Sequence, residues 1–267
     1  MVIVRPAIEA HDVLGESCLW CPTTRKLWWI DIERPCLQSF DPVRSEHRIF
    51  PLPGRFCGCA ALRRSGGLVL ALDDGLHAFD PATGGLEFLV RPESDRPENR
   101  YNDGRCDRRG RLWIGTMNTG PRQPTAIPNS TAFSPDDRTF YLADTPRHVI
   151  WAFDLDIDAA TLANRRVFVD LTARSPSPDG SCVDAEGFLW NAEYRGARIT
   201  RYAPDGRVDR TIEVPVSHPT CCCFGGEHLD TLYVTSAGRD RLANPIEGAV
   251  LAIDVGIKGL PEATFGG

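Results

Sequence analysis

The 267-residue sequence has no apolar run of the roughly 20 residues that a helix needs to cross a bilayer. It also has no long basic run, because its 30 Lys and Arg residues are scattered and its formal net charge is −6. We therefore expect no nucleic-acid partner and no membrane partner. Residues 1–12 lack a basic stretch followed by an apolar one, so we read no signal peptide and expect a cytoplasmic protein.

Long helices are hard to place, because 24 glycines and 21 prolines interrupt the chain along its length. Short runs rich in Val, Ile, Leu, Trp, Tyr and Phe stand between them, and such runs are typical of β-strands. Hydrophobic residues make up 42% and charged residues 25%, as in globular proteins. In a cytoplasmic protein the ten cysteines are expected to be reduced thiols rather than a disulfide framework.

A turn followed by an apolar strand recurs six times along the chain. Each copy is marked by one large side chain: Trp28, Leu68, Trp113, Tyr141, Trp190 and Tyr233. The successive spacings are 40, 45, 28, 49 and 43 residues, and a second strand–turn–strand segment follows most copies. This pattern predicts an all-β fold, a six-bladed β-propeller, because a blade is a four-stranded sheet of about this length. A β-sandwich explains the recurring intervals less well.

The third repeat is abnormally short. Only 28 residues separate Trp113 from Tyr141, and the strand–turn–strand segment is replaced there by residues 118–130, which include three prolines. We therefore expect the third blade to be shortened to about two strands. Its outer edge would expose unpaired backbone groups unless residues 118–128 cover it.

Four polar residues precede their repeat's large side chain by 11 or 12 residues: Glu16, Asn102, Asn129 and Asp179. Equivalent positions in different blades lie at equivalent heights, so these side chains should surround one end of the central channel. Carboxylate and amide oxygens are ligands for hard cations, and the set does not indicate a zinc-selective site. The alternative is that they are ordinary turn residues, since Asn-Asp-Gly and Pro-Asp-Gly are common turn sequences.

Several motifs spread over the whole chain are similar to those of one family. They are Leu14-Gly15-Glu16-Ser17 with Trp20, Arg100-Tyr101-Asn102-Asp103-Gly104, Gly115-Thr116-Met117, Pro128-Asn129, Pro178-Asp179-Gly180, the segment 184–190 and Cys222-Cys223-Phe224-Gly225-Gly226. With them the sequence resembles the SMP-30/gluconolactonase/regucalcin-like family of sugar lactonases. The resemblance implies a single propeller domain over residues 1–267.

The resemblance also implies a site and an activity. The metal ligands would be Glu16, Asn129 and Asp179, holding one divalent cation (Ca, Zn, Mn, Mg or Fe), and the substrate contacts would be Arg100 and Asn102. The expected reaction is metal-dependent opening of an aldonolactone, such as glucono- or xylonolactone, to the sugar acid. As a ligand and the nearest carboxylate, Asp179 is our candidate catalytic base. We expect a monomer or a weak dimer.

Two departures from the family pattern leave alternatives open. Cys18 stands where the family usually has proline, and the short third blade has no counterpart of a Gly-Ser-Leu-Tyr-like strand whose nearby acidic residue helps to bind substrate. The alternatives are a phosphotriesterase or arylesterase on the same fold, and a calcium-binding propeller without catalytic activity. A covalent serine mechanism is not expected, because no Gly-x-Ser-x-Gly motif occurs.

Overall fold

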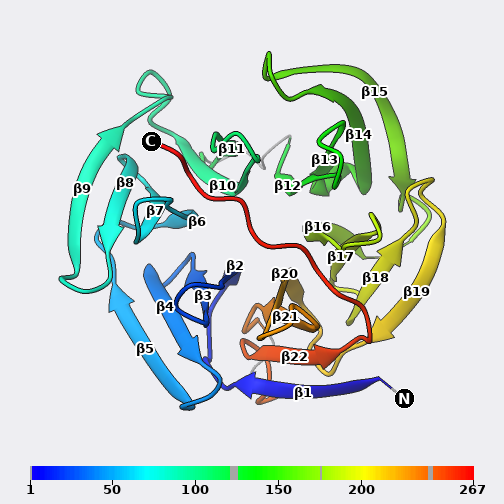
Figure 1. Cartoon of the computed structure of the whole chain (residues 1–267), viewed down its shortest axis with the longest axis horizontal. Helices are drawn as coiled ribbons and strands as arrows, with labels where there is room; N and C mark the ends of the chain where they lie inside the picture. The colour runs from blue at the N-terminus through cyan, green and yellow to red at the C-terminus, as the bar shows by residue number, and fades with distance from the viewer. Residues whose placement is uncertain (1, 121–125, 175, 240–242) are drawn as a thin grey trace.

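The computed structural model in Figure 1 is a ring of antiparallel β-sheets arranged around a central axis. The structure describes residues 2–120, 126–174, 176–239 and 243–267. Five sheets have four strands each, and their innermost strands face the axis while their outermost strands form the rim (Figure 1). Burial follows this order: β2 is buried almost throughout, whereas β5 at the edge of the same sheet is largely exposed.

The strands of the complete blades follow one another along the chain. The first blade contains β2 (Gly15–Cys21), β3 (Lys26–Asp31), β4 (Cys36–Asp41) and β5 (Glu46–Pro51). The second contains β6 (Cys57–Leu62), β7 (Leu68–Leu72), β8 (Gly75–Asp80) and β9 (Gly85–Val90). Next come β12 (Pro128–Phe133), β13 (Thr139–Asp144), β14 (Val149–Asp156) and β15 (Thr161–Asp170), then β16 (Ser177–Val183), β17 (Leu189–Tyr194), β18 (Arg198–Tyr202) and β19 (Val208–Glu213).

The last blade joins the two ends of the chain. It consists of β20 (Pro219–Gly225), β21 (Thr231–Ser236), β22 (Val250–Asp254) and, as its outer strand, β1 (Ile3–Ile8). Ile3 pairs with Asp254 and Ile8 with Val250, so the N-terminal strand completes the sheet that the C-terminal strand began. One 3₁₀ helix, η1 (Thr145–Arg147), connects β13 to β14.

The predicted propeller class is confirmed, but the predicted number of blades needs correction. The ring contains five complete blades rather than six, because the third sheet consists of only β10 (Asn99–Cys106) and β11 (Leu112–Asn118). The physical reason is the short interval after Trp113: β11 is followed by β12 of the next blade, so no two outer strands are formed. Whether residues 118–128 cover the edge depends on residues 121–125, which lie outside the described parts of the chain.

The next blade supports this two-stranded sheet. The ring of Trp113 on β11 packs against Phe133 and Phe140, with centroid distances of 6.1 and 5.3 Å. At the turn between β10 and β11, the Arg111 guanidinium donates to the carbonyl of Ile157, near the tip of the β14–β15 hairpin. These contacts supply part of the packing that missing outer strands would otherwise provide.

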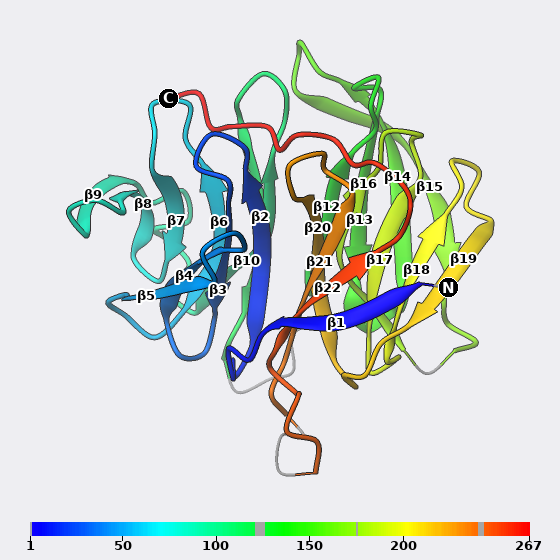
Figure 2. The same ribbon diagram turned by 60° about the horizontal axis from the view of Figure 1, so that its bottom comes forward.

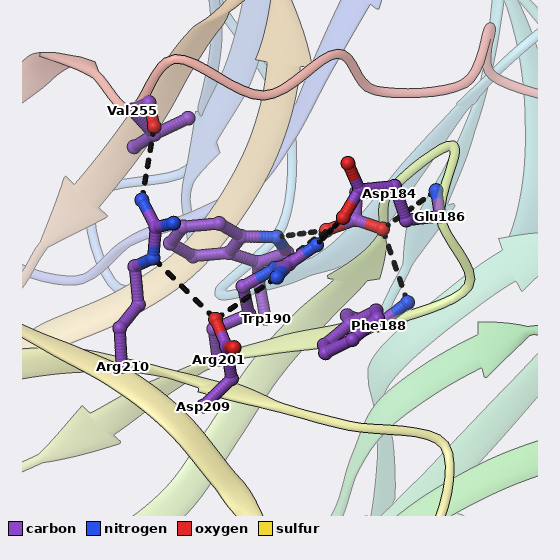
Figure 3. A network of polar contacts seen from close by, with 8 residues as sticks. All are labelled: Asp184, Glu186, Phe188, Trp190, Arg201, Asp209, Arg210 and Val255. Carbon is purple, nitrogen blue, oxygen red and sulfur yellow. Dashed lines mark hydrogen bonds and ion pairs between the residues drawn. The ribbon is translucent and has the colours of Figure 1, made fainter.

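A repeated side-chain arrangement holds the turn before the second strand in two of the sheets. In Figure 3, the buried Asp184 carboxylate accepts hydrogen bonds from Trp190 Nε1 (2.8 Å) and Arg201 Nε (2.8 Å), and from the backbone N–H groups of Glu186 and Phe188. The guanidinium of Arg201 lies 3.7 Å from the centroid of the Phe188 ring. This network joins Asp184 to Trp190, six residues later along the chain, and so fixes the turn between β16 and β17.

The third sheet contains the same arrangement. Asp107 accepts from Trp113 Nε1 at 2.8 Å, from Arg111 Nε at 2.7 Å and from two backbone N–H groups of its own turn. Trp113 and Trp190 are therefore equivalent residues, as the sequence repeats predicted. The two-stranded sheet therefore corresponds to the two inner strands of a complete blade.

The C-terminal residues 255–267 form a strap that crosses one face of the ring (Figures 1 and 2). Gly259 donates to the Leu229 carbonyl at 2.7 Å, and Gly266 donates to the Gly110 carbonyl at 2.9 Å. Between them, Glu262 accepts from Arg105 of β10 at 2.6 Å, with both side chains largely buried. The strap thus links the last blade to the two-stranded sheet across the axis.

No helix in the described ranges is long and apolar enough to span a membrane. All ten cysteines lie within those ranges and are unpaired, and nine of them are buried. Burial raises the pKa of most of these thiols, including Cys18 and Cys59 near the ring axis, which disfavours their thiolate forms.

Candidate functional site

The innermost strand of every sheet contains an irregularity at the same place, where two residues oppose one residue of the neighbouring strand. These β-bulges are residues 17–18, 58–59, 102–103, 130–131, 179–180 and 220–221. A bulge interrupts the strict alternation of side chains between the two faces of a strand and changes the direction in which a side chain points. Six equivalent bulges around one axis therefore create a common location for functional side chains.

The four residues predicted from repeat spacing lie either in one of these bulges or directly before it. Asn102 and Asp179 are the first residues of their bulges, whereas Glu16 and Asn129 come immediately before theirs. This difference accounts for the spacings of 11 and 12 residues. All four side chains are buried, on β2, β10, β12 and β16.

The backbone is unusual where a ligand candidate precedes the bulge. Ser17 after Glu16 has φ 52°, and Ser130 after Asn129 has φ 57°. Both are left-handed conformations that non-glycine residues seldom adopt. The two positions thus share a local geometry that the other four bulges do not have among the described residues.

A chain of hydrogen bonds connects the polar residues of β10 and β12. Arg100 Nη1 donates to Asn102 Oδ1 at 2.8 Å, and Asn102 Nδ2 donates to Asn129 Oδ1 at 3.0 Å. Asn102 Nδ2 also donates to the Pro128 carbonyl at 2.8 Å. The structure therefore brings together Arg100, Asn102 and Asn129, as the sequence predicted, across two neighbouring sheets.

Glu16 and Asp179 form the acidic part of the site. Burial, and after it nearby negative charge, raises the pKa values of both carboxyl groups: Asp103 acts on Glu16, and Glu16 and Asp103 act on Asp179. Arg100 is close enough to favour the charged form of Glu16. Two interacting buried carboxyl groups disfavour two uncompensated negative charges, which favours a bound proton or a bound cation.

Sequence reasoning missed two residues of this region. Asp103, the second residue of the β10 bulge, is buried, accepts from the Thr131 N–H at 2.7 Å and raises the pKa values of Glu16 and Asp179. The sequence feature that could have identified Asp103 is its position directly after Asn102. Thr145 in η1 accepts from Asn129 Nδ2 at 2.8 Å, and nothing in the sequence marks that contact.

The donor set fits a hard divalent cation. Glu16 and Asp179 would supply carboxylate oxygens and Asn129 an amide oxygen, so the three candidate ligands are all oxygen donors at the bulges of the inner strands. Within the described ranges, no group of three or more His, Cys, Asp or Glu side chains is arranged to hold a metal ion. The third donor here is an amide, which such a group does not include.

One protein-family model matches most of the chain. The model of the SMP-30/gluconolactonase/LRE-like region matches residues 14–126 and 121–238. The two matched segments meet at residues 121–126, directly after the short sheet.

Curated proteins and solved structures are similar over nearly the whole length. The 6-deoxy-6-sulfogluconolactonase of Pseudomonas putida is 34% identical, with 97% of both chains covered. The L-arabinolactonase of Azospirillum brasilense is also 34% identical, with 97% of this chain and 94% of the relative covered. A crystal structure of a calcium-binding protein, regucalcin, from Agrobacterium tumefaciens has a TM-score of 0.92 at 33% identity, covering 98% of this chain and 97% of that one.

Proposed function

Because the chain belongs to the SMP-30/gluconolactonase/LRE-like family, we propose that it hydrolyses sugar lactones to sugar acids with the help of one divalent cation. The observation that carries the proposal is that two buried carboxyl groups, Glu16 and Asp179, lie at the bulges of β2 and β16, while Arg100, Asn102 and Asn129 form one hydrogen-bond chain at the corresponding bulges of β10 and β12. Hydrolysis of a lactone needs a base that takes a proton from the attacking water and a group that stabilises the charge developing on the carbonyl oxygen.

Glu16, Asn129 and Asp179 would hold the cation. When bound, the cation favours the ionised forms of both carboxyl groups and polarises the lactone carbonyl. Calcium, zinc, manganese, magnesium and iron all remain candidates. Calcium has support from the similar regucalcin of Agrobacterium tumefaciens, which is described as a calcium-binding protein.

Asp179 would act as the base. Its carboxylate takes a proton from water while the water oxygen bonds to the lactone carbonyl carbon. The ring C–O bond then breaks, the carboxyl group of the product forms, and Asp179 returns the proton to the departing ring oxygen. The net reaction consumes one water and one lactone and yields the open hydroxy acid.

Arg100 would orient the substrate. Among the described residues, only one of its terminal nitrogens is used in hydrogen bonds, to Tyr101 O and Asn102 Oδ1, so other N–H groups are available to sugar hydroxyls. Asn102 uses both ends of its amide within the protein. We therefore assign direct substrate contact mainly to Arg100. Asn102 also contacts the substrate but contributes less to its binding.

A pH-stat assay with several aldonolactones tests this function. The protein is stripped of metal and then supplied separately with Ca²⁺, Zn²⁺, Mn²⁺, Mg²⁺ or Fe²⁺, and acid release is recorded. Turnover that depends on a cation supports the proposal. Cleavage of organophosphates or aryl esters in preference to lactones would favour the same-fold esterase alternative, and cation binding without any turnover would favour a calcium-binding propeller.

We also propose that β10 and β11 represent a reduced third blade of a ring with six-fold arrangement. The Asp107–Trp113 pair, which matches Asp184–Trp190, supports this view. On the same basis residues 1–267 form a single propeller domain. We propose that it works in the cytoplasm as a monomer or weak dimer, and the ten unpaired cysteines support that location.

A further inference from the structure

Thr145 stands at the end of the hydrogen-bond chain that passes through the candidate site. Its hydroxyl lies 2.8 Å from Asn129 Nδ2 and 2.9 Å from the carbonyl oxygen of Pro178. Asn129 belongs to β12 and Pro178 to β16, immediately before Asp179. One half-buried hydroxyl on η1 thus contacts the two neighbouring strands that carry two of the candidate cation ligands.

The chemistry of the partners fixes the direction of each bond. The Pro178 carbonyl can only accept, so the single hydroxyl proton of Thr145 is donated to it. Toward Asn129 the hydroxyl can then act only as an acceptor. Asn129 must present its NH₂ group to Thr145, and its Oδ1 must point the other way.

The opposite end of the chain imposes the same orientation independently. Arg100 can only donate, so it fixes Oδ1 of Asn102, and the carbonyl of Pro128 fixes Nδ2 of Asn102. That Nδ2 group then donates to Oδ1 of Asn129. Hydrogen bonds therefore run in one direction from a guanidinium on β10 to a carbonyl on β16, and the orientation of the Asn129 amide follows from both ends.

We infer that Thr145 is a positioning residue, which sets the Asn129 amide so that its oxygen rather than its nitrogen faces the cation, and which ties β12 to the segment before Asp179. The inference rests on the proposed function, because it assigns Thr145 a role toward the same cation. Groups that orient a metal ligand commonly contribute about 10–100-fold to metal affinity.

The backbone around Thr145 makes such a role feasible. Its N–H donates to the Ile127 carbonyl at 3.1 Å, and its carbonyl accepts from the His148 N–H at 3.1 Å, so the turn is held without the side chain. Pro146 follows within η1, and His148 adopts a left-handed conformation that ends the helix. Removing the hydroxyl should therefore leave the turn in place.

The test is calorimetric titration of metal-stripped protein with Ca²⁺ and Mn²⁺, comparing Thr145→Val, Thr145→Ser and the wild type. Valine keeps the shape but removes the hydroxyl, and we expect the cation Kd to rise about 10–100-fold. Serine keeps the hydroxyl and should bind within a few-fold of wild type. Thr211→Val, at an exposed position of β19, is the matched control and should not change Kd.

Other readouts separate positioning from a structural role and from failure of the proposed function. Raising the cation concentration should restore lactone turnover by Thr145→Val, while the thermal unfolding of the cation-free variant should stay close to wild type. An unchanged Kd in Thr145→Val, with wild type binding and turning over normally, would overturn this inference alone. A wild type that binds neither cation and opens no lactone would overturn the proposed function and the inference with it.

Discussion

We assign Asp179 two tasks, to hold the cation and to act as the base, and both depend on its carboxyl group. Its carboxyl group interacts electrostatically with Glu16, whereas its backbone carbonyl accepts from Ser130 Oγ at 2.5 Å and from Asn191 Nδ2 at 2.9 Å. In Asp179→Asn those backbone contacts persist and only the carboxylate is lost. We expect kcat for lactone opening to fall at least about 100-fold, with thermal unfolding unchanged or raised. Turnover like that of the wild type would refute the catalytic assignment.

Arg100 and Arg55 form a natural pair for testing substrate contact. Their guanidinium groups lie 5.5 and 5.2 Å from the centroid of the same ring, Phe56, but only Arg100 joins the hydrogen-bond chain of the site. Arg100→Ala should raise KM for the lactone about 10–100-fold, because charge-assisted hydrogen bonds are lost. Cation affinity should stay roughly the same, since a guanidinium does not bind a cation and the Pro128 carbonyl and Thr145 still orient the amides of Asn102 and Asn129. Arg55→Ala is the control, and a collapse of cation binding in Arg100→Ala would mean that Arg100 organises the ligands instead.

Asp12 is a buried carboxyl outside the site and should make stability depend on pH. Burial raises its pKa to about 7, although it accepts from Trp29 Nε1 at 2.8 Å and Gln38 Nε2 at 2.6 Å. Between the ordinary aspartate pKa of 3.8 and about 7, the folded state holds a proton on Asp12 that the unfolded state releases. The contribution of Asp12 therefore decreases as pH rises through this window, with a slope approaching about 1.4 kcal/mol per pH unit.

Urea unfolding of Asp12→Asn and wild type between pH 4 and 8 measures that contribution. The difference between the two free energies of unfolding should change across the window and become constant above pH 7. An exposed carboxylate, Asp95, provides the control substitution Asp95→Asn. A difference that does not vary with pH would show that Asp12 titrates normally.

At the scale of single elements, the Asp–Trp turns of the third and fifth sheets give a matched comparison. Asp184 pairs with Arg201, whose side chain is 3% exposed and which also pairs with Glu186 and Asp209, whereas Asp107 pairs with Arg111, whose side chain is 35% exposed. Removing a carboxylate costs most where the donors that it satisfied stay buried, and here the Nε1 of the buried Trp190 and the buried Arg201 lose an acceptor. Asp184→Ala should lower the free energy of unfolding by about 1–3 kcal/mol, and Asp107→Ala by clearly less. Equal losses in urea titrations would contradict this view of the two turns.

The elements themselves could be predicted because their signals are local. Trp28, Trp113 and Trp190 lie on the second strands of their sheets, and apolar runs after turn residues identify such strands from sequence alone. The absence of outer strands in the third sheet could also be predicted, since the chain has too few residues there to form them.

The finer geometry of the site could not be predicted. Equal spacing from an anchor indicates a common height, but only the bulges explain why Glu16 and Asn129 occupy a different position from Asn102 and Asp179. Thr145 meets Asn129, 16 residues earlier in the same sheet, and this contact depends on the register that pairs Pro128 of β12 with Asp144 of β13. No local pattern carries that information.

At the scale of the whole molecule, the incomplete third sheet should limit stability. Roughly 15–20 residues would be needed to add the missing hairpin after Met117, by comparison with the neighbouring repeats. Such an insertion should raise the melting temperature, because it supplies partners for the edge of β11, which pairs with no described strand other than β10. If its acidic residue reaches the substrate, it should also lower KM.

A Gly/Ser insertion of the same length at the same place is the control, and it should not stabilise the protein. Calorimetry would record both variants. A hairpin variant that melts no higher than the control would indicate that the short sheet is already fully satisfied by its neighbours, such as the β14–β15 hairpin.

The pairing of β1 with β22 has a consequence for the order of events during synthesis. Ile3 leaves the ribosome about 250 residues before its partner Asp254. Until residues 250–254 emerge, β1 has no sheet to join, and the blade begun by β20 and β21 lacks half its strands. The circle therefore cannot close on the nascent chain until translation is nearly finished, and the earlier blades must persist meanwhile as an open arc with one uncovered end.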